Sequence, residues 1–278
     1  MIIIADSGST KTSWRIIDEK CTISQNESVG LNPYYLKEEQ LRAEILNSFL
    51  SDYRDATGTS LYFYGSGCAS PEKSTLMEGI FKEALPKAAI HVHDDMLAAA
   101  RATCNKEEGI VCILGTGSNS CQFDGSKVVG NVPTTGYILG DEGSGSHMGK
   151  LLLADFIRGQ LPPDLREKLL AQYALTRDEI LNNVYHKERP NRYLAKFAKF
   201  ILGNIRHPYI AQLIHENFLD FFSKNILLYP RYRELNTHFV GSIAWYFNGP
   251  LRKAASEKGI RVKNIIENPI AGLTLYHQ

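Results

Sequence analysis

A pattern of short apolar strand, Gly/Ser/Thr-rich turn and returning strand occurs twice in the sequence. The first copy occupies residues 2–17, with its turn at 6–12, and the second occupies 110–123, with its turn at 115–120. Two apolar runs joined by such a turn predict a β-hairpin. Because an internal repeat indicates repeated structural units, we expect two similar domains, each containing one hairpin.

Strand and helix signals alternate along the rest of the chain. Short apolar runs are followed by stretches in which apolar residues recur at helical spacing. This alternation is typical of the α/β class. We expect strands at 23–30, 61–64, 89–92 and 238–240, and helices at 36–52, 71–85, 96–104, within 150–229 and at 268–275.

The composition excludes several classes of protein. With 31 Lys+Arg and 30 Asp+Glu, the formal net charge is +1, which argues against nucleic acid as a partner. The sequence contains no uncharged apolar run of about 18 residues, so we expect no membrane span. The amino terminus lacks the basic region of a signal peptide, so we expect a cytoplasmic protein whose five cysteines are reduced and mostly buried.

The two hairpin turns have the composition of phosphate-binding loops. Small residues let a phosphate approach the backbone, and successive N–H groups form a concavity that binds anions. Asp6 stands before the first turn, where a carboxylate could hold Mg²⁺, and Lys11 could balance phosphate charge. A single turn of this kind is adequately explained as a plain β-turn. Two matching turns favour phosphate binding.

Acidic residues at strand-to-helix junctions are the candidates for catalysis. Asp94 and Asp95 end an expected strand and open a helix, where α/β proteins place groups that face a ligand. A carboxylate there can act as a general base, although helix capping would explain one aspartate. Asp141 and Glu142 stand between glycines before another helix, and capping or function explains them equally well. Ser66, in a loop after a strand, is a weaker candidate for a ligand contact.

Four motifs in order resemble a known family. They are Asp6-Ser7-Gly8-Ser9-Thr10-Lys11-Thr12, Gly115-Thr116-Gly117-Ser118-Asn119, Gly140-Asp141-Glu142-Gly143-Ser144-Gly145 and Gly241-Ser242-Ile243-Ala244. The chain resembles the BadF/BadG/BcrA/BcrD-type ATPase family and its N-acetylglucosamine kinase-like branch, within the sugar kinase, Hsp70 and actin superfamily. The resemblance implies two ribonuclease H-like (actin-like ATPase) domains with an ATP cleft between them. Their expected boundaries are 1–107, to which a helix at 268–278 returns, and 108–267.

The resemblance also implies roles for individual residues. Asp6 would hold Mg²⁺, and Asp95 would be the catalytic base and a sugar contact, with Asp94 as the alternative base. The ATP contacts would be Gly8, Ser9, Thr10 and Lys11 in the first loop, Thr116 and Gly117 in the second, and Gly241 and Ser242 at the adenosine. The other sugar contacts would be Asn32, Ser66, Gly136 and Asp141. At Gly136 the family's Gly-Gly-Trp-Gly motif is replaced by Thr135-Gly136-Tyr137.

Together these residues predict an ATP- and Mg²⁺-dependent kinase. Its substrate would be N-acetylglucosamine or a related amino sugar, phosphorylated on a primary hydroxyl, and the family suggests a homodimer. One alternative is an ATPase activator of acyl-CoA reductases or dehydratases, which would need cysteines to bridge an iron–sulfur cluster. Cys104 and Cys121 lack that sequence context. The other alternative is a sugar or nucleotide sensor that binds without turnover.

Overall fold

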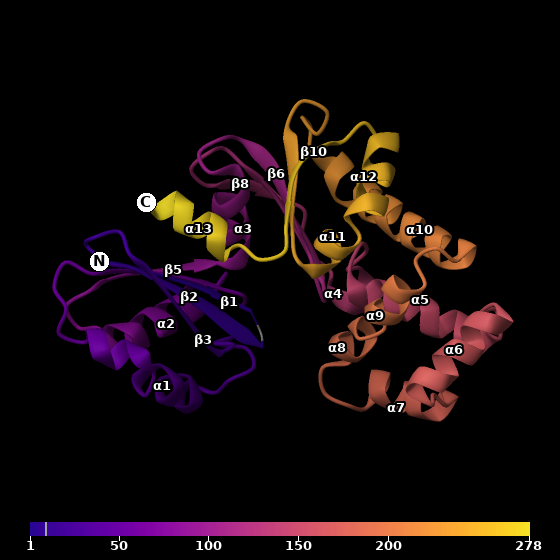
Figure 1. Ribbon diagram of the computed structural model, residues 1–278, viewed down its shortest axis with the longest axis horizontal. Coiled ribbons are helices and arrows are strands. Elements are labelled where there is room, and N and C mark those ends of the chain that lie inside the picture. Colours follow the sequence, from indigo (N-terminus) through magenta and orange to yellow (C-terminus); the bar gives the residue numbers. More distant parts are fainter. Residues whose placement is uncertain (9) are drawn as a thin grey trace. The chain divides into compact units, whose positions relative to one another are not determined.

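The chain folds into two compact units, each built on a five-stranded sheet (Figure 1). The computed structural model describes residues 1–8 and 10–278. The first unit comprises Met1–Lys106 and Pro269–Gln278, and the second comprises Glu107–Asn268. The fold is therefore α/β with a mixed sheet in each unit.

In the first unit the hairpin extends into a sheet of order β3-β2-β1-β4-β5. Its strands are β1 (Ile2–Ser7), β2 (Lys11–Ile17), β3 (Ile23–Val29), β4 (Ser60–Gly65) and β5 (Ala89–Asp94). The first three strands are antiparallel neighbours, whereas β4 and β5 run parallel to β1. Ser7 pairs with Gly65, and Gly65 with Asp94, so three strands end side by side at one edge of the sheet.

Helices cover both faces of this sheet because side chains alternate along its strands. They are α1 (Glu38–Leu46), α2 (Pro71–Ala84), α3 (Asp95–Cys104) and α13 (Ile270–His277). One apolar cluster contains Ile3 and residues of α1 and α2, whereas the other contains Ile4 and residues of α3 and α13. The last helix packs closely on α3, since a Cβ on Gly272 would lie 2.2 Å from the carbonyl oxygen of Ala102.

The second unit repeats the hairpin in a sheet of order β10-β9-β6-β7-β8. Its strands are β6 (Gly109–Leu114), β7 (Ser118–Phe123), β8 (Val128–Asn131), β9 (Asn236–Val240) and β10 (Arg261–Ile266). Its helices are α4 (Gly136–Leu139), α5 (Gly145–Arg158), α6 (Pro163–Tyr173), α7 (Arg177–Tyr185), α8 (Pro190–Ala195), α9 (Ala198–Gly203), α10 (Pro208–Lys224), α11 (Ser242–Tyr246) and α12 (Asn248–Glu257). Phe218, Phe221 and Phe222 of α10 lie fully buried in the apolar core of this unit.

Most of the expected elements are present, but three details differ. The single helix expected at 36–52 is wrong: α1 ends at Leu46, and a separate 3₁₀ helix spans Phe49–Tyr53. The break occurs at Ser48, because its extended backbone interrupts the helix. The side chain of Ser48 then caps the 3₁₀ helix by accepting a hydrogen bond from Leu50 N–H. Strands β8 and β10 were not predicted from the sequence.

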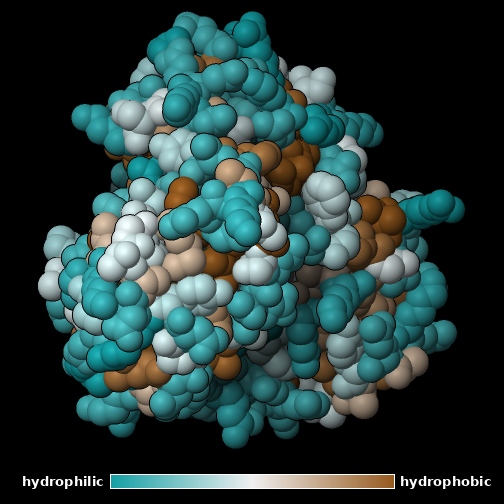
Figure 2. Space-filling view, turned by 60° about the vertical axis from the view of Figure 1, so that its left-hand side comes forward, coloured by the Kyte–Doolittle hydropathy of each residue, from teal (hydrophilic) through white to brown (hydrophobic). Residues whose placement is uncertain are grey.

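The surface is mostly hydrophilic on the face shown in Figure 2, and most of the cysteines are buried. Hydrophobic residues on the face shown in Figure 2 form small separate patches among hydrophilic ones. Within residues 1–8 and 10–278, no helix has the length and apolar character needed to cross a membrane. None of the five cysteines forms a disulfide bond; Cys21 is exposed and the other four are buried.

Candidate functional site

The edge of the first sheet where β1, β4 and β5 end carries two carboxylates, those of Asp6 and Asp95. Asp6 is the penultimate residue of β1, and Asp95 follows the last residue of β5. Burial, reinforced by the charge of Asp95, raises the pKa of Asp6 to about 7. Burial and the charge of Asp94 raise the pKa of Asp95 to about 6, against the opposing effect of nearby backbone N–H groups. A carboxylate whose ionisation is disfavoured by burial and by a neighbouring negative charge is a candidate for holding a cation or a transferable proton.

The neighbouring aspartates at 94 and 95 have different structural roles. Asp94 is the N-cap of α3, and its Oδ1 accepts from Leu97 N–H at 2.7 Å. Asp95 is the first residue of the helix, so its carboxylate is not needed for that cap. Capping therefore accounts for Asp94 and leaves Asp95 as the carboxylate available for chemistry.

Asn32 and Ser66 lie together at the same sheet edge. Asn32 Nδ2 donates to Ser66 Oγ at 3.2 Å, and Ser66 Oγ donates to the carbonyl of Ser7 at 3.3 Å. Asn32 is 5% exposed, and its Oδ1 accepts from Tyr34 N–H at 2.9 Å. The side chains of Asn32 and Ser66 are thus held in fixed positions beside the end of β1.

A buried hydroxyl pair anchors the loop that carries Asn32. Ser7 Oγ lies 2.8 Å from Thr12 Oγ1 across the hairpin, and Thr12 Oγ1 donates to the carbonyl of Val29. Ser7 Oγ also accepts from Leu31 N–H at 2.9 Å. These bonds join β1, β2 and the end of β3, so the phosphate-type motif also has a structural function.

The residues predicted to bind phosphate in the turn of the first hairpin make several contacts within the protein itself. Gly8 N–H donates to the carbonyl of Lys11 at 3.0 Å, and both Gly8 and Thr10 are exposed. Ser9, a predicted phosphate contact, lies outside the described residues. Lys11 forms an ion pair with Glu27 on β3, so its ammonium already has a carboxylate partner.

In the second unit, the hairpin turn is fastened to the start of α5. Gly115 N–H donates to the carbonyl of Gly117, and the carbonyls of Gly115 and Thr116 accept from Gly145 and Ser146 N–H at 2.9 and 3.1 Å. The first amides of α5 are therefore occupied by the turn. These amides hold the backbone of the hairpin turn in place, so they are not free to bind an anion.

Asp141 packs directly against this turn. A Cβ on Gly117 would lie 2.9 Å from Asp141 Oδ2, and Asp141 Oδ1 accepts from Ser118 N–H at 3.3 Å. The backbone of Asp141 has a φ of 59°, a left-handed conformation that is uncommon outside glycine. Burial raises the pKa of Asp141, and the charge of Glu142 adds to this effect. The structure therefore brings the second and third motifs together.

The fourth motif meets the same turn from the other side. Gly241 has a φ of 114°, and a Cβ there would lie 2.4 Å from the carbonyl oxygen of Leu114. Ser242 lines a cavity of about 350 Å³ together with Gly115 and Thr116. The remaining lining residues are Gly145, Ala195, Ala198, Lys199, Leu202, Ile243, Tyr246 and Phe247. A mostly apolar cavity beside a Gly/Thr turn can take a planar base next to phosphate groups.

A smaller polar cavity of about 240 Å³ lies beside Asp141. Its lining residues are Ser118, Val132, Pro133, Thr134, Thr135, Leu139, Asp141, Glu142, Lys224 and Asn225. Gly136, a predicted sugar contact, does not line it. Gly136 instead begins α4, with a φ of 72°, and its carbonyl accepts from Gly140 N–H at 2.8 Å.

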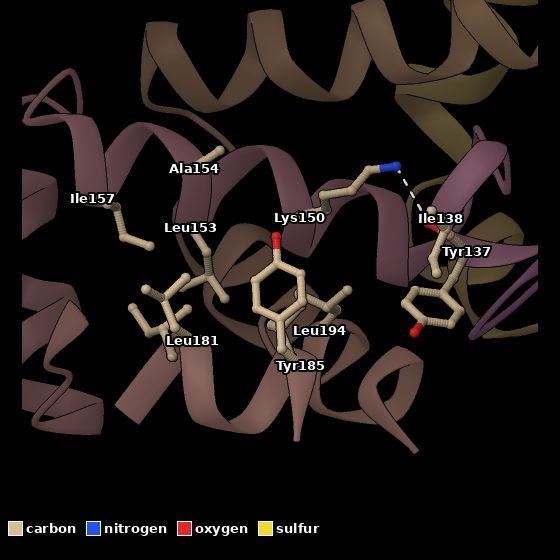
Figure 3. Close-up of a pocket in the computed structure, with 11 residues that line it drawn as sticks. Tyr137, Ile138, Lys150, Leu153, Ala154, Ile157, Leu181, Tyr185 and Leu194 are labelled. Carbon is tan, nitrogen blue, oxygen red and sulfur yellow. Dashed lines mark hydrogen bonds between the residues drawn. The ribbon is translucent and has the colours of Figure 1, made fainter. Parts of the chain in front are cut away.

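A third cavity contains none of the predicted site residues. It lies between α5 and the segment from α7 to α8 (Figure 3). Its volume is about 360 Å³, and its walls are mostly aliphatic. Lys150 at one end donates to the carbonyl of Tyr137 at 3.3 Å, which ties α4 to α5.

Sequence reasoning missed the residues of α10 that hold the Gly-Asp-Glu-Gly loop. Asn217 Oδ1 accepts from Gly143 N–H at 3.0 Å and lies 2.7 Å from His147 Nδ1. Lys224 donates to Glu142 Oε1 at 2.7 Å. The spacing of seven residues between Asn217 and Lys224 puts both on one face of α10. A polar pair at helical spacing inside an otherwise apolar stripe could have shown them.

Asp6 offers one carboxylate that fits a magnesium ion. No group of three or more His, Cys, Asp or Glu with ligand geometry occurs in the described parts of the chain. Mg²⁺ is commonly held by one or two carboxylates together with waters and substrate phosphates. The buried carboxylate of Asp6, near the end of β1, is consistent with such a site.

Two sheets, each with a strand–turn–strand motif and helices on its faces, define an actin-like ATPase fold. Comparison with known families then identifies the chain more narrowly. The model of the BadF/BadG/BcrA/BcrD ATPase family matches residues 5–217, and the chain belongs to this family.

The chain is similar to several proteins that have been described as N-acetylglucosamine kinases. A candidate N-acetylglucosamine kinase from Porphyromonas gingivalis is 40% identical, with a TM-score of 0.91, and the match covers 100% of this chain and 98% of that one. A second candidate, from Chromobacterium violaceum, is 18% identical with a TM-score of 0.80 over 100% and 98% of the chains, and supports the fold alone. The N-acetyl-D-glucosamine kinase of Dictyostelium discoideum is 27% identical in a 195-position alignment that covers 63% of this chain. The match spans 61% of that curated relative's length.

Proposed function

We propose that the protein is an ATP-dependent kinase that phosphorylates a primary hydroxyl of N-acetylglucosamine or a related amino sugar. Membership of an ATPase family implies ATP use. The observation that carries the proposal is the carboxylate of Asp95, which is free of the capping bond made by Asp94 and lies at the sheet edge that also holds Asp6, Asn32 and Ser66.

Asp95 is the proposed general base. A base is most effective when its pKa lies near the working pH, and the pKa of Asp95 is raised to about 6. Its carboxylate would accept the proton of the sugar hydroxyl as that oxygen attacks the γ-phosphorus of ATP, while the bond from the γ-phosphorus to the bridging oxygen breaks and ADP leaves. Most of the rate gain in phosphoryl transfer comes from alignment and charge stabilisation, so the residues that fix the sugar matter as much as the base.

The remaining residues are assigned to binding. Asn32, Ser66 and Asp141 would hold the sugar, and Asp6 would hold Mg²⁺, which supplies positive charge to the phosphates. The proposed phosphate contacts are Gly8, Ser9, Thr10, Lys11, Thr116 and Gly117. Gly241 and Ser242 would contact the adenosine, which the 350 Å³ cavity suits in size and apolar character. Gly136 stays a proposed contact through its backbone.

The alternative functions have less support. An activator of acyl-CoA reductases or dehydratases would use cysteines at a surface to hold an iron–sulfur cluster. Cys104 and Cys121 are 3% and 0% exposed, which does not suit that role. A sensor that binds without turnover has no need for a carboxylate with the position and pKa of Asp95. The proposal includes a cytoplasmic homodimer, which light scattering and cell fractionation would check.

The test is ADP release from ATP and Mg²⁺ with N-acetylglucosamine, N-acetylmannosamine, glucosamine, glucose or no sugar. We expect release that depends on one amino sugar. Equal release with and without sugar would refute the kinase and favour the activator. Sugar or nucleotide binding with no release would favour the sensor.

A further inference from the structure

The polar cavity beside Asp141 combines hydrogen-bond donors and acceptors in one small space. Its volume of about 240 Å³ is below the roughly 300–1,000 Å³ of sites for drug-sized ligands, so it suits a single sugar ring or one substituent. Three hydroxyl side chains line it, together with the two carboxylates of Asp141 and Glu142 and the ammonium of Lys224.

The ammonium of Lys224 is held by one hydrogen bond and can donate others. Its Nζ donates to Glu142 Oε1 at 2.7 Å, and the side chain of Glu142 is 11% exposed whereas that of Lys224 is 57% exposed. Burial opposes ionisation of Glu142, yet the nearby ammonium lowers its pKa below the ordinary value. An ammonium has three N–H donors, and within the described residues this bond to Glu142 is the hydrogen bond that Lys224 makes. Two donors are therefore left for other partners on a side chain that lines the cavity.

Asp141 supplies the complementary acceptor. Its Oδ1 accepts a long bond from Ser118 N–H, so its carboxylate keeps further acceptor positions. Two residues of α10 hold the loop that carries Asp141. Lys224 donates to Glu142, and Asn217 accepts from Gly143 N–H. A rigid acceptor and a rigid donor thus line the same cavity.

The charge of the cavity selects against anions. Two carboxylates and one ammonium leave a formal charge of −1, which repels a phosphate or a sugar acid. An acetamido group is neutral and presents one N–H donor and one carbonyl acceptor, which match a carboxylate and an ammonium.

We propose that Lys224 is a specificity-determining residue that donates to the acetamide carbonyl of the sugar, while Asp141 accepts from the acetamide N–H. This inference rests on the proposed sugar kinase function and names the group that its substrate must carry. In this chain the pair takes over recognition at the place where Thr135-Gly136-Tyr137 replaces the family's glycine-rich motif.

The experiment is isothermal titration of N-acetylglucosamine and of glucose into the wild type and Lys224→Met, which removes the donors and keeps a side chain of similar reach. We expect the Kd of N-acetylglucosamine to weaken about tenfold and the Kd of glucose to change less than about twofold, as for the loss of one charge-assisted hydrogen bond. The Kd of ATP is expected to stay unchanged. Lys168→Met is the matched control, because Lys168 is similarly exposed at 58% and pairs with Asp164, but lines none of the cavities described above.

Two further variants separate recognition from folding. Glu142→Gln with Lys224→Met removes both members of the ion pair, so residue 142 is not left as a carboxylate without its partner, and the double variant is expected to show the same loss of selectivity. Lys224→Arg keeps the charge and the donors, and is expected to retain most of the preference for N-acetylglucosamine.

An equal weakening for both sugars, or no change, would overturn the role of Lys224. If the wild type shows sugar-dependent ADP release while the variants keep the preference, this inference alone fails. If the wild type binds neither sugar, the proposed function and the inference both fail.

Discussion

Substituting the adjacent residues Asp94 and Asp95 should produce opposite effects on stability and activity. Asp94→Ala removes the N-cap bond to Leu97 N–H at 2.7 Å, and the loss of such a cap costs about 1 kcal/mol of the free energy of unfolding. Sugar-dependent ADP release at saturating substrate should stay within about threefold of the wild type, since a capping residue does not touch the reacting atoms.

Asp95→Asn should abolish most activity and raise stability at neutral pH. The pKa of Asp95 is raised from 3.8 to about 6, and at about 1.36 kcal/mol for each pKa unit the ionised carboxylate costs roughly 3 kcal/mol. Because the folded pKa lies above the unfolded one, this cost develops as pH rises from about 4 to about 6 and is complete at about pH 7. Asparagine avoids the cost but cannot accept the proton, so ADP release should fall by about 10²- to 10⁴-fold.

Urea unfolding and a coupled ADP assay on both variants measure the two effects. The reasoning is refuted if Asp94→Ala loses the activity and Asp95→Asn keeps it, because the base and the cap would then be exchanged. Loss of stability in Asp95→Asn at about pH 7 would refute the charge argument separately.

Two other predictions concern the folding of each unit. Gly241→Ala forces an alanine into a φ of 114° with its Cβ 2.4 Å from the carbonyl oxygen of Leu114, so the free energy of unfolding should fall by at least about 2 kcal/mol. Among the described residues, a Cβ on Gly249 in α12 would meet no atom within 4 Å beyond its chain neighbours and its own helix backbone, so Gly249→Ala should instead raise the free energy of unfolding by about 0.5–1 kcal/mol. The urea midpoints of the two variants measure this difference. Burial and the charge of Arg101 lower the pKa of His277 to about 4, so the unfolded chain takes up this proton first and stability should fall as pH drops from about 6.5 to about 4. His277→Gln should flatten this pH dependence in urea titrations, and an unchanged slope would contradict the assignment.

The sequence allowed the hairpins and the strand-to-helix junctions to be predicted because their signals are local. Short apolar runs bounded by Gly, Ser and Asp identify β1, β4, β5 and β6 without tertiary information. Strand β10 was missed because its residues, Arg261–Ile266, mix charged and apolar side chains. The break after Leu46 depends on one serine cap, which helical periodicity does not reveal.

The candidate site was predictable only in part. Asp6, Asn32, Ser66 and Asp95 could be proposed from motifs, and three of them lie at strand ends whose register places them along one sheet edge. Lys224 lies far along the chain from Glu142, and only the packing of α10 on the Gly-Asp-Glu-Gly loop brings the two together. The spacing of polar residues on α10 could have singled out Asn217 and Lys224, but their partners in the loop depend on long-range packing.

Identification of the phosphorylated product tests the central claim most directly. Protein, ATP, Mg²⁺ and N-acetylglucosamine would be incubated and followed by phosphorus NMR, with the position of the phosphate read from its coupling to sugar protons. We expect a phosphomonoester on the primary hydroxyl that forms in step with ADP and is absent with Asp95→Asn. ADP and inorganic phosphate as the only products, formed equally without sugar, would contradict the proposed kinase.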